Sequence, residues 1–192
     1  MTQSRLITQI DYARAGKITP QMEAVAAKEH KTPEEIRAGV AKGCIAIPAN
    51  IHHTALSPEG VGEGMRTKVN VNLGISGDLM NAEMELEKVR TAIELGAEGI
   101  MDLSNHGKTH EFRKMVIDMS PAMIGTVPMY DAIGYLEKPL IGIKAQDFLD
   151  VVRAHAEDGV DFVTIHAGMN RRTIENFKET GRLMNIVSRG GS

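Results

Sequence analysis

A histidine at the end of an apolar segment is the residue in this chain that is best suited to chemistry near neutral pH. His166 closes the run Val-Asp-Phe-Val-Thr-Ile-His that begins at residue 160. An imidazole can change its charge or bind a metal close to pH 7. Such a run predicts a strand buried on both faces of a parallel sheet, and folds of this kind place their chemistry at the carboxyl ends of the strands. His166 is therefore a candidate site residue, with a hydrogen-bonded core histidine as the alternative.

The residues at or just beyond the carboxyl ends of the other predicted strands are mostly polar. They offer amides, hydroxyls, a phenol and a guanidinium, with few carboxylates, and this set favours the binding of a polar, anionic small molecule. In chain order they are Asn70, Asn72, Met101, Asp102, Ser104, Thr126, Tyr130, Thr164, Ser188, Arg189 and Gly190.

Several of these residues have a purely structural alternative. Asn70 and Asn72 share one face of their strand, because alternate side chains of a strand point the same way. Burying an amide without a partner is costly, so we favour ligand binding over a structural hydrogen bond. Met101 taken alone is typical of a core, and Tyr130, in a predicted loop, is typical of a surface.

Two further features leave alternatives open. Asp102 could serve the site, or it could pair with Lys68 inside the protein. The sequence Ser-Arg-Gly-Gly-Ser at 188–192 offers backbone N–H groups beside a fixed cation. That combination predicts a phosphate-binding loop, and the alternative is an ordinary glycine-rich turn.

Four histidines outside these strands do not predict a metal site. No carboxylate or cysteine stands at ligand spacing beside them. We therefore expect solvated side chains at His52, His53, His106 and His110. We expect the same of the charged run 83–90, which is typical of the wet face of a helix.

The elements that must position the candidate residues fall into two regions. Residues 1–64 predict a helical lead-in, with helices at 1–15, from Pro20 and over 33–42, a short strand at 44–47 and then a loop. Thr32-Pro33-Glu34-Glu35 is a helix start with a capping box. Residues 65–192 predict strands at 68–74, 99–104, 122–128, 160–168 and 185–188, with helices at 82–95, 109–119, 146–157 and 171–179.

This alternation predicts an α/β fold whose parallel strands are joined by right-handed crossovers. The near-regular spacing of the units favours a (β/α)8 barrel over an open sheet. Eight units need about 200 residues or more, and about five strands can be counted here. We therefore expect an incomplete TIM-type barrel, preceded by the helical lead-in.

The composition excludes several classes of protein. The 192 residues carry a net charge of −3 and contain no basic block, which argues against binding to nucleic acid or to a membrane surface. No apolar run approaches the roughly 20 residues of a membrane span, and no signal sequence is recognised. One cysteine, Cys44, excludes an internal disulfide. These features predict a cytoplasmic protein.

Six sequence blocks together resemble the phosphomethylpyrimidine synthase family of thiamine biosynthesis, in the order and spacing of that family and across essentially the entire chain. The blocks are Ile-Pro-Ala-Asn at 47–50, Lys-Val-Asn-Val-Asn-Leu-Gly at 68–74, Met-Asp-Leu-Ser at 101–104, Ile-Gly-Thr-Val-Pro-Met-Tyr at 124–130, Thr-Ile-His-Ala-Gly at 164–168 and Ile-Val-Ser-Arg-Gly-Gly-Ser at 186–192.

The resemblance implies a barrel enzyme that uses S-adenosylmethionine and a [4Fe-4S] cluster to form a 5′-deoxyadenosyl radical. Its reaction would be a lyase-type rearrangement of 5-aminoimidazole ribotide into hydroxymethylpyrimidine phosphate. The resemblance also implies a homodimer in the full-length form and a zinc-type second metal. Carried over by position, the substrate-binding residues are Asn72, Met101, Tyr130, His166, Ser188, Arg189 and Gly190.

The chain also departs from the family pattern. The family carries its cluster on a carboxyl-terminal Cys-x-x-Cys-x-x-x-x-Cys and its second metal on later histidines, and neither is found in this chain. We therefore expect a truncated chain that holds part of the substrate but is inactive alone.

Three alternatives remain. One is 5-hydroxybenzimidazole synthase, which uses the same ribotide to make the lower ligand of cobamides. Another is a non-catalytic fragment that binds ribotide or a partner chain. The third, a generic phosphate-binding barrel enzyme such as an aldolase, is disfavoured because Lys68 is the only lysine at a predicted strand.

Overall fold

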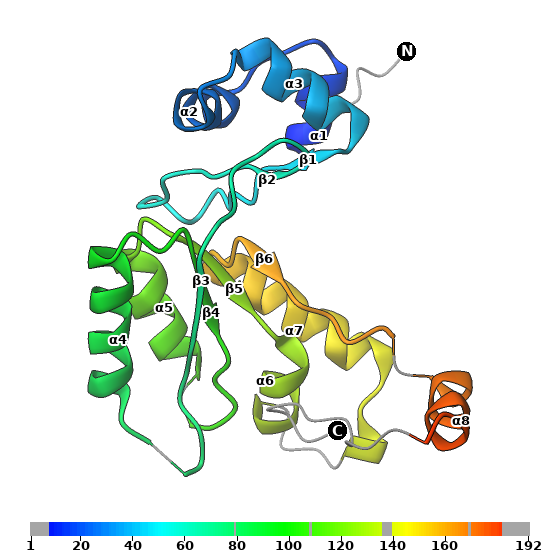
Figure 1. The fold of residues 1–192 in the computed structure, drawn as a ribbon. Coiled ribbons are helices and arrows are strands. Elements are labelled where there is room, and N and C mark those ends of the chain that lie inside the picture. The colour runs from blue at the N-terminus through cyan, green and yellow to red at the C-terminus, as the bar shows by residue number, and fades with distance from the viewer. Residues whose placement is uncertain (1–7, 79, 108, 136–139, 169, 182–192) are drawn as a thin grey trace.

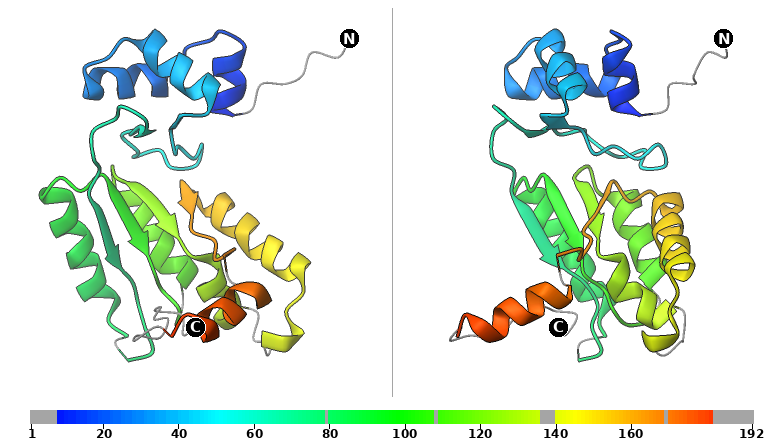
Figure 2. Two further views of the ribbon diagram at one scale, coloured as in Figure 1. Left: turned by 45° about the vertical axis from the view of Figure 1, so that its right-hand side comes forward. Right: turned by 90° about the vertical axis from the view of Figure 1, so that its right-hand side faces the viewer.

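The computed structural model describes residues 8–78, 80–107, 109–135, 140–168 and 170–181. In that part of the chain, a layer of three helices stands over one end of a parallel sheet, and further helices cover one face of the sheet (Figures 1 and 2). The protein is therefore a mixed α/β fold, as the sequence predicts.

The amino-terminal layer consists of α1 (Gln9–Arg14), α2 (Pro20–Glu29) and α3 (Pro33–Lys42), followed by the antiparallel pair β1 (Ile45–Ala46) and β2 (Val61–Gly62). The predicted capping box is confirmed at α3. The hydroxyl of Thr32 accepts a hydrogen bond from the backbone N–H of Glu35 at 3.2 Å, and the Glu35 carboxylate accepts from the N–H of Thr32 at 2.8 Å. Gly43, with φ of 78°, ends the helix. Local capping chemistry therefore sets both ends of α3.

The main sheet has four parallel strands in the order β3 (Asn70–Leu73), β4 (Gly99–Asp102), β5 (Met123–Thr126) and β6 (Phe162–Val163). The helices that join or follow these strands are α4 (Ala82–Glu94), α5 (Thr109–Met119), α6 (Pro128–Tyr135) and α7 (Ala145–Asp158), with a 3-10 turn η1 (Leu140–Gly142), and α8 (Arg171–Glu179) comes after β6. The parallel pairing confirms the predicted strand–helix alternation.

The described strands form an open sheet rather than a closed barrel. The predicted strand at 185–188 lies outside the described residues, as does the beginning of the predicted helix 1–15. The prediction that the segment 160–168 is buried on both faces is wrong. Val163 and Ile165 are 37% and 45% exposed, because among the described strands β6 is the edge of the sheet and pairs only with β5.

An apolar cluster fills the space between the sheet and the helices α4 and α5. Ile100, Ile124 and Phe112 are almost fully buried there, together with Leu73 and Val89. Because side chains alternate across a strand, the residues between these positions point to the other face of the sheet. That other face carries the candidate site.

Candidate functional site

A cavity of about 640 Å³ lies on the face of the sheet away from α4 and α5. It brings together four of the predicted substrate residues, which come from β3, β4, α6 and the segment after β6: Asn72, Met101, Tyr130 and His166. Asn70 and Thr164 also line it. The other three predicted substrate residues, Ser188, Arg189 and Gly190, lie outside the described residues.

The strand register explains how the floor of the cavity is made. Asn72 is paired with Met101, Met101 with Gly125, and Gly125 with Phe162, so four neighbouring strands each place one residue in a single row. The side-chain amide of Asn70 donates a hydrogen bond to the Asn72 side-chain oxygen at 3.0 Å. The two asparagines therefore form one polar wall beside a more apolar floor.

Gly125 lies between Met101 and Phe162 in that row. It was not among the site residues predicted from the sequence. A Cβ at this position would lie 2.3 Å from the ring of Phe162 and 2.4 Å from the sulfur of Met101. No side chain fits there unless these neighbours move. The absence of a side chain therefore leaves room for both Met101 and Phe162 over this position. The only signal in the sequence was a glycine inside a predicted strand, which often marks a close approach.

Tyr130 and His166 face each other at the carboxyl ends of the strands. Their ring centroids are 5.6 Å apart and the rings are tilted by 39°. Tyr130 was predicted to lie in a loop, but it is the third residue of α6. That helix begins directly after β5 because Pro128 suits a first helical position, where a backbone N–H is not needed.

A buried polar network lies behind Tyr130, and the next residue, Asp131, is its centre. The Asp131 carboxylate accepts hydrogen bonds from the hydroxyl of Thr109 at 2.6 Å and from Nε2 of His155 at 2.9 Å. Arg113 contacts the same carboxylate at 3.3 Å. Burial raises the pKa of Asp131, but these hydrogen bonds and the charge of Arg113 outweigh burial and hold the pKa below its usual value.

Asp102 does not pair with Lys68, so that alternative is wrong. Lys68 lines the cavity and is ion-paired with Glu29 of α2 instead. Asp102 is buried on the helix side of the sheet and accepts a hydrogen bond from the N–H of Ser104 at 2.9 Å. Burial raises the pKa of the Asp102 carboxyl.

His53 is not solvated, contrary to the prediction. It is 4% exposed, with Nδ1 at 2.7 Å from the Asp161 carboxylate and Nε2 at 2.8 Å from the backbone oxygen of Ser120. The same carboxylate accepts hydrogen bonds from the N–H groups of Asn50 at 2.9 Å and of Ile124 at 2.8 Å. We call His53, Asn50 and Asp161 the clasp, because they join the loop after β1 to the start of β6. Burial lowers the pKa of His53, but the hydrogen bond and charge of Asp161 outweigh it, and the pKa is raised.

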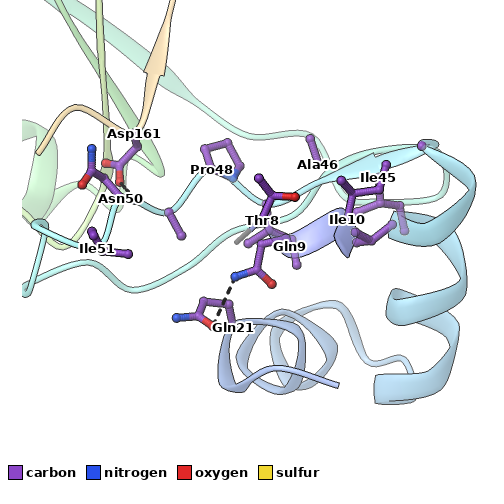
Figure 3. A pocket seen from close by; sticks show the side chains of 14 residues that line it. Thr8, Gln9, Ile10, Gln21, Ile45, Ala46, Pro48, Asn50, Ile51 and Asp161 are labelled. Atoms are coloured by element: carbon purple, nitrogen blue, oxygen red, sulfur yellow. Dashed lines mark hydrogen bonds between the residues drawn. The ribbon is translucent and has the colours of Figure 1, made fainter. Parts of the chain in front are cut away.

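The clasp borders a second cavity, of about 540 Å³, between the amino-terminal helices and the loop after β1. Figure 3 shows Asn50 and Asp161 at one end of it and Ile10 and Ile45 at the other. The side-chain amide of Gln9 donates a hydrogen bond to the side-chain oxygen of Gln21 between these ends, at 3.3 Å. None of the residues predicted to bind substrate lines this cavity.

The exposure of the other residues that were expected to be solvated mostly agrees with the prediction. His52, His106 and His110 are exposed, although His110 pairs with Asp158 at 2.9 Å. Glu85 is an exception in the run that was expected to face water. It is buried and accepts a hydrogen bond from the N–H of Gly74 at 2.9 Å, which fixes the turn after β3.

The described residues offer no group of three or more His, Cys, Asp or Glu side chains that could hold a metal ion. The one cysteine of the chain, Cys44, is exposed. Because a [4Fe-4S] cluster is held by several thiolates, the residues of this chain do not fit that group. In the same part of the chain, no helix is both long and apolar enough to span a bilayer.

Comparison with known proteins gives a consistent result. The chain is 64% identical to a phosphomethylpyrimidine synthase of Alkaliphilus metalliredigens, over 96% of this chain and 42% of that protein. It is 61% identical to a protein of the same name from Clostridium tetani, over 96% of this chain and 40% of that protein. The chain thus spans about two-fifths of the length of the curated relatives it matches. Residues 8–192 match the sequence model of a family described as the radical SAM ThiC family. The chain therefore belongs to the radical SAM ThiC family.

Proposed function

We propose that this chain carries the ribotide-binding part of a phosphomethylpyrimidine synthase. The reaction of the whole enzyme would convert 5-aminoimidazole ribotide into hydroxymethylpyrimidine phosphate. The observation that carries the proposal is the meeting of Asn72, Met101, Tyr130 and His166 in one cavity. Those residues were carried over from the family by their positions in the sequence alone.

The chemistry of the cavity suits a phosphorylated nucleoside. The Asn72 amide, the phenol of Tyr130 and the imidazole of His166 can donate hydrogen bonds to oxygens of the ligand. Met101 and Phe162 provide an apolar surface beside them. Ser188, Arg189 and Gly190 would complete the site by holding the phosphate, because an arginine with free backbone N–H groups suits that anion.

The four parallel strands are proposed to be part of a (β/α)8 barrel, with residues 65–192 contributing to it and residues 1–64 as a lead-in. The cavity-facing row from Asn72 to Phe162 would then be part of the barrel interior. Two observations support this: the strands are parallel, and the helices α4 and α5 pack on the face opposite the cavity.

S-adenosylmethionine, a [4Fe-4S] cluster and a zinc-type metal are implied by the family and not by these residues. The cluster would supply the electron that cleaves S-adenosylmethionine. Since one cysteine cannot hold a cluster, we derive no catalytic step from this chain. Its own residues bind and orient the ribotide. A cytoplasmic location and a homodimer belong to the same proposal.

The names of the relatives favour the thiamine pyrimidine as the product. Proteins at 64% and 61% identity are both named phosphomethylpyrimidine synthase. This supports the pyrimidine synthase over 5-hydroxybenzimidazole synthase, which would use the same ribotide.

Titration calorimetry of the 192-residue chain with 5-aminoimidazole ribotide tests the proposal. We expect saturable binding that Asn72→Ala and His166→Ala each weaken about tenfold or more, because a hydrogen bond to a charged ligand contributes about 1.5–3 kcal/mol. His52→Ala is the matched control, since this histidine is exposed and outside the cavity. Equal affinity of the two cavity variants and the wild type, or no ribotide binding at all, would refute the proposal.

A further inference from the structure

Helix α6 carries Tyr130 to the cavity, and it also carries a buried carboxylate, Asp131. The apolar cluster behind the sheet is built from residues of the strands, α4, α5 and the adjoining turns. On α6, Pro128 and Ala132 are buried. Buried polar contacts also hold this short helix against α5 and α7.

Those contacts converge on Asp131. Asp131 is 5% exposed, and its carboxylate contacts three side chains from two helices. Thr109 and Arg113 of α5 are at 2.6 and 3.3 Å, and His155 of α7 is at 2.9 Å. A carboxylate that accepts hydrogen bonds from two neighbouring helices fixes both the position of its own helix and the rotation about its axis.

The network also returns to the strand that precedes α6. Nδ1 of His155 lies 2.9 Å from the hydroxyl of Thr126, the last residue of β5. Because the Asp131 carboxylate only accepts, Nε2 of His155 carries the proton in that contact. Arg113 is held in turn by Asp158, through Nε at 2.8 Å and Nη2 at 2.7 Å. Strand β5 and the helices α5, α6 and α7 are thus joined by one set of buried polar groups.

Tyr130 and Asp131 are consecutive residues of an α-helix, so their side chains point about 100° apart around its axis. One side chain faces His166 across the cavity rim, with ring centroids 5.6 Å apart, and the other faces α5 and α7. Any rotation of α6 moves both side chains together. We propose that Asp131 is a positioning residue that holds Tyr130 in the geometry needed to bind ribotide. This proposal rests on the proposed function for the identity of the ligand.

A purely structural role for Asp131 predicts a different pattern of effects. Loss of a stabilising contact would lower the stability of the chain without a specific effect on the Tyr130 ring. A positioning role predicts that the ring moves and that ligand affinity falls, even in the molecules that remain folded. Measurements on the folded population therefore separate the two roles.

The test compares Asp131→Asn with Val116→Ala, both measured well below their unfolding temperatures. Val116 is fully buried in the apolar cluster, so its truncation lowers stability without touching α6. We expect Asp131→Asn to weaken ribotide binding about tenfold, as is typical when residues of one network are coupled. Val116→Ala should change the affinity less than about twofold. In a chain that already carries Tyr130→Ala, adding Asp131→Asn should change the ribotide affinity very little.

A second measurement needs no ligand. Nuclear Overhauser effects between the rings of Tyr130 and His166 should weaken in Asp131→Asn and persist in Val116→Ala. If Asp131→Asn fails to fold, Thr109→Val removes a single hydroxyl bond to the same carboxylate and should produce a smaller change in the same direction. Unchanged ring contacts together with unchanged affinity would overturn the positioning role. A wild-type chain that binds no ribotide would instead refute the proposed function, and the ring contacts would still decide the role of Asp131.

Discussion

At the scale of single residues, the floor of the cavity depends on Gly125, which has no side chain. Gly125 lies between Met101 and Phe162, and a Cβ there would approach both within 2.4 Å. Met101 and Phe162 can both occupy the space over this position because it is a glycine. A side chain at this position would displace Met101 and Phe162, which both line the cavity.

Gly125→Ala should push Met101 and Phe162 apart. Inserting a methyl group into a packed site typically costs about 1–3 kcal/mol, and the displaced floor should also weaken ribotide binding about tenfold. Chemical denaturation and titration calorimetry measure the two effects. Adding Phe162→Leu should make room for the new methyl group and restore much of the loss in stability. Failure of this second substitution to restore any stability would show that the contacts at Gly125 do not limit the packing.

At the scale of secondary-structure elements, the clasp gives the loop after β1 a pH-dependent attachment. Both partners of the His53 ring, the Asp161 carboxylate and the Ser120 carbonyl, only accept hydrogen bonds. Both ring nitrogens must therefore carry protons, which requires the charged imidazolium. This geometry agrees with the raised pKa of His53.

The free energy of unfolding should therefore fall as the pH rises above the ordinary value of 6.5 for this side chain. A group whose pKa is higher in the folded state contributes its full stabilisation below the unfolded pKa and loses it as the pH passes through the folded pKa. Urea denaturation at a series of pH values measures this slope. His53→Gln should reduce it, whereas His52→Gln, at the exposed neighbour, should leave it unchanged. If the unfolding free energy of His53→Gln depended on pH as steeply as that of the wild type, the His53 side chain would not be charged in the clasp.

The elements that local sequence determines were predicted well. Thr32 and Glu35 cap α3 by contacts three residues apart, and the alternation of strands with helices after residue 68 correctly indicated parallel strands. Contacts that are distant in the sequence were missed. His53 was expected in water because its carboxylate partner is 108 residues away. The segment 160–168 was expected to be buried, since its apolar residues do not reveal that β6 is the last strand of the sheet among the described residues.

In the candidate site, too, features set by neighbouring residues in the sequence could be predicted, and features set by distant contacts could not. Asn70 and Asn72 could be placed on one face from strand alternation alone. Met101 was identified only through resemblance to a family, because a methionine in a strand is ordinary. Gly125 and Asp131 act through neighbours on other strands and helices, so their roles depend on packing that no local pattern describes.

At the scale of the whole molecule, an ion cluster joins the amino-terminal helices to the sheet. Its members are Lys28, Glu29, Glu59, Arg66, Lys68 and Glu98. Glu29 and Lys68 form its most buried pair, with side chains 3% and 8% exposed. Burial raises the pKa of Glu29, but hydrogen bonds from the Arg66 backbone and from Lys68 outweigh burial and lower it. The cluster therefore holds Glu29 charged at the boundary between the layers.

Glu29→Gln should lower the free energy of unfolding by about 3 kcal/mol, because removing one partner of a buried pair leaves the other charge uncompensated. Glu83→Gln is the matched control. Glu83 also pairs with an arginine, but its side chain is 76% exposed, and such pairs contribute about 0.5 kcal/mol. Urea denaturation of both variants measures the difference. Equal losses would mean that the cluster contributes no more than a surface ion pair.

The clasp also determines how late in translation the loop after β1 can be fixed to the start of β6. Asn50 is bonded to Asp161, a residue 111 positions later in the sequence. At translation rates of about 5–20 residues per second, Asn50 leaves the peptidyl-transferase centre roughly 6–22 s before its partner is synthesised. The amino-terminal helices and their ion pairs with Glu59, Arg66 and Lys68 can form during that interval, but the loop after β1 cannot yet be fixed to the start of β6. Nascent chains stalled before residue 161 should therefore be cleaved by protease in the loop after β1, and chains extended well past it should be protected.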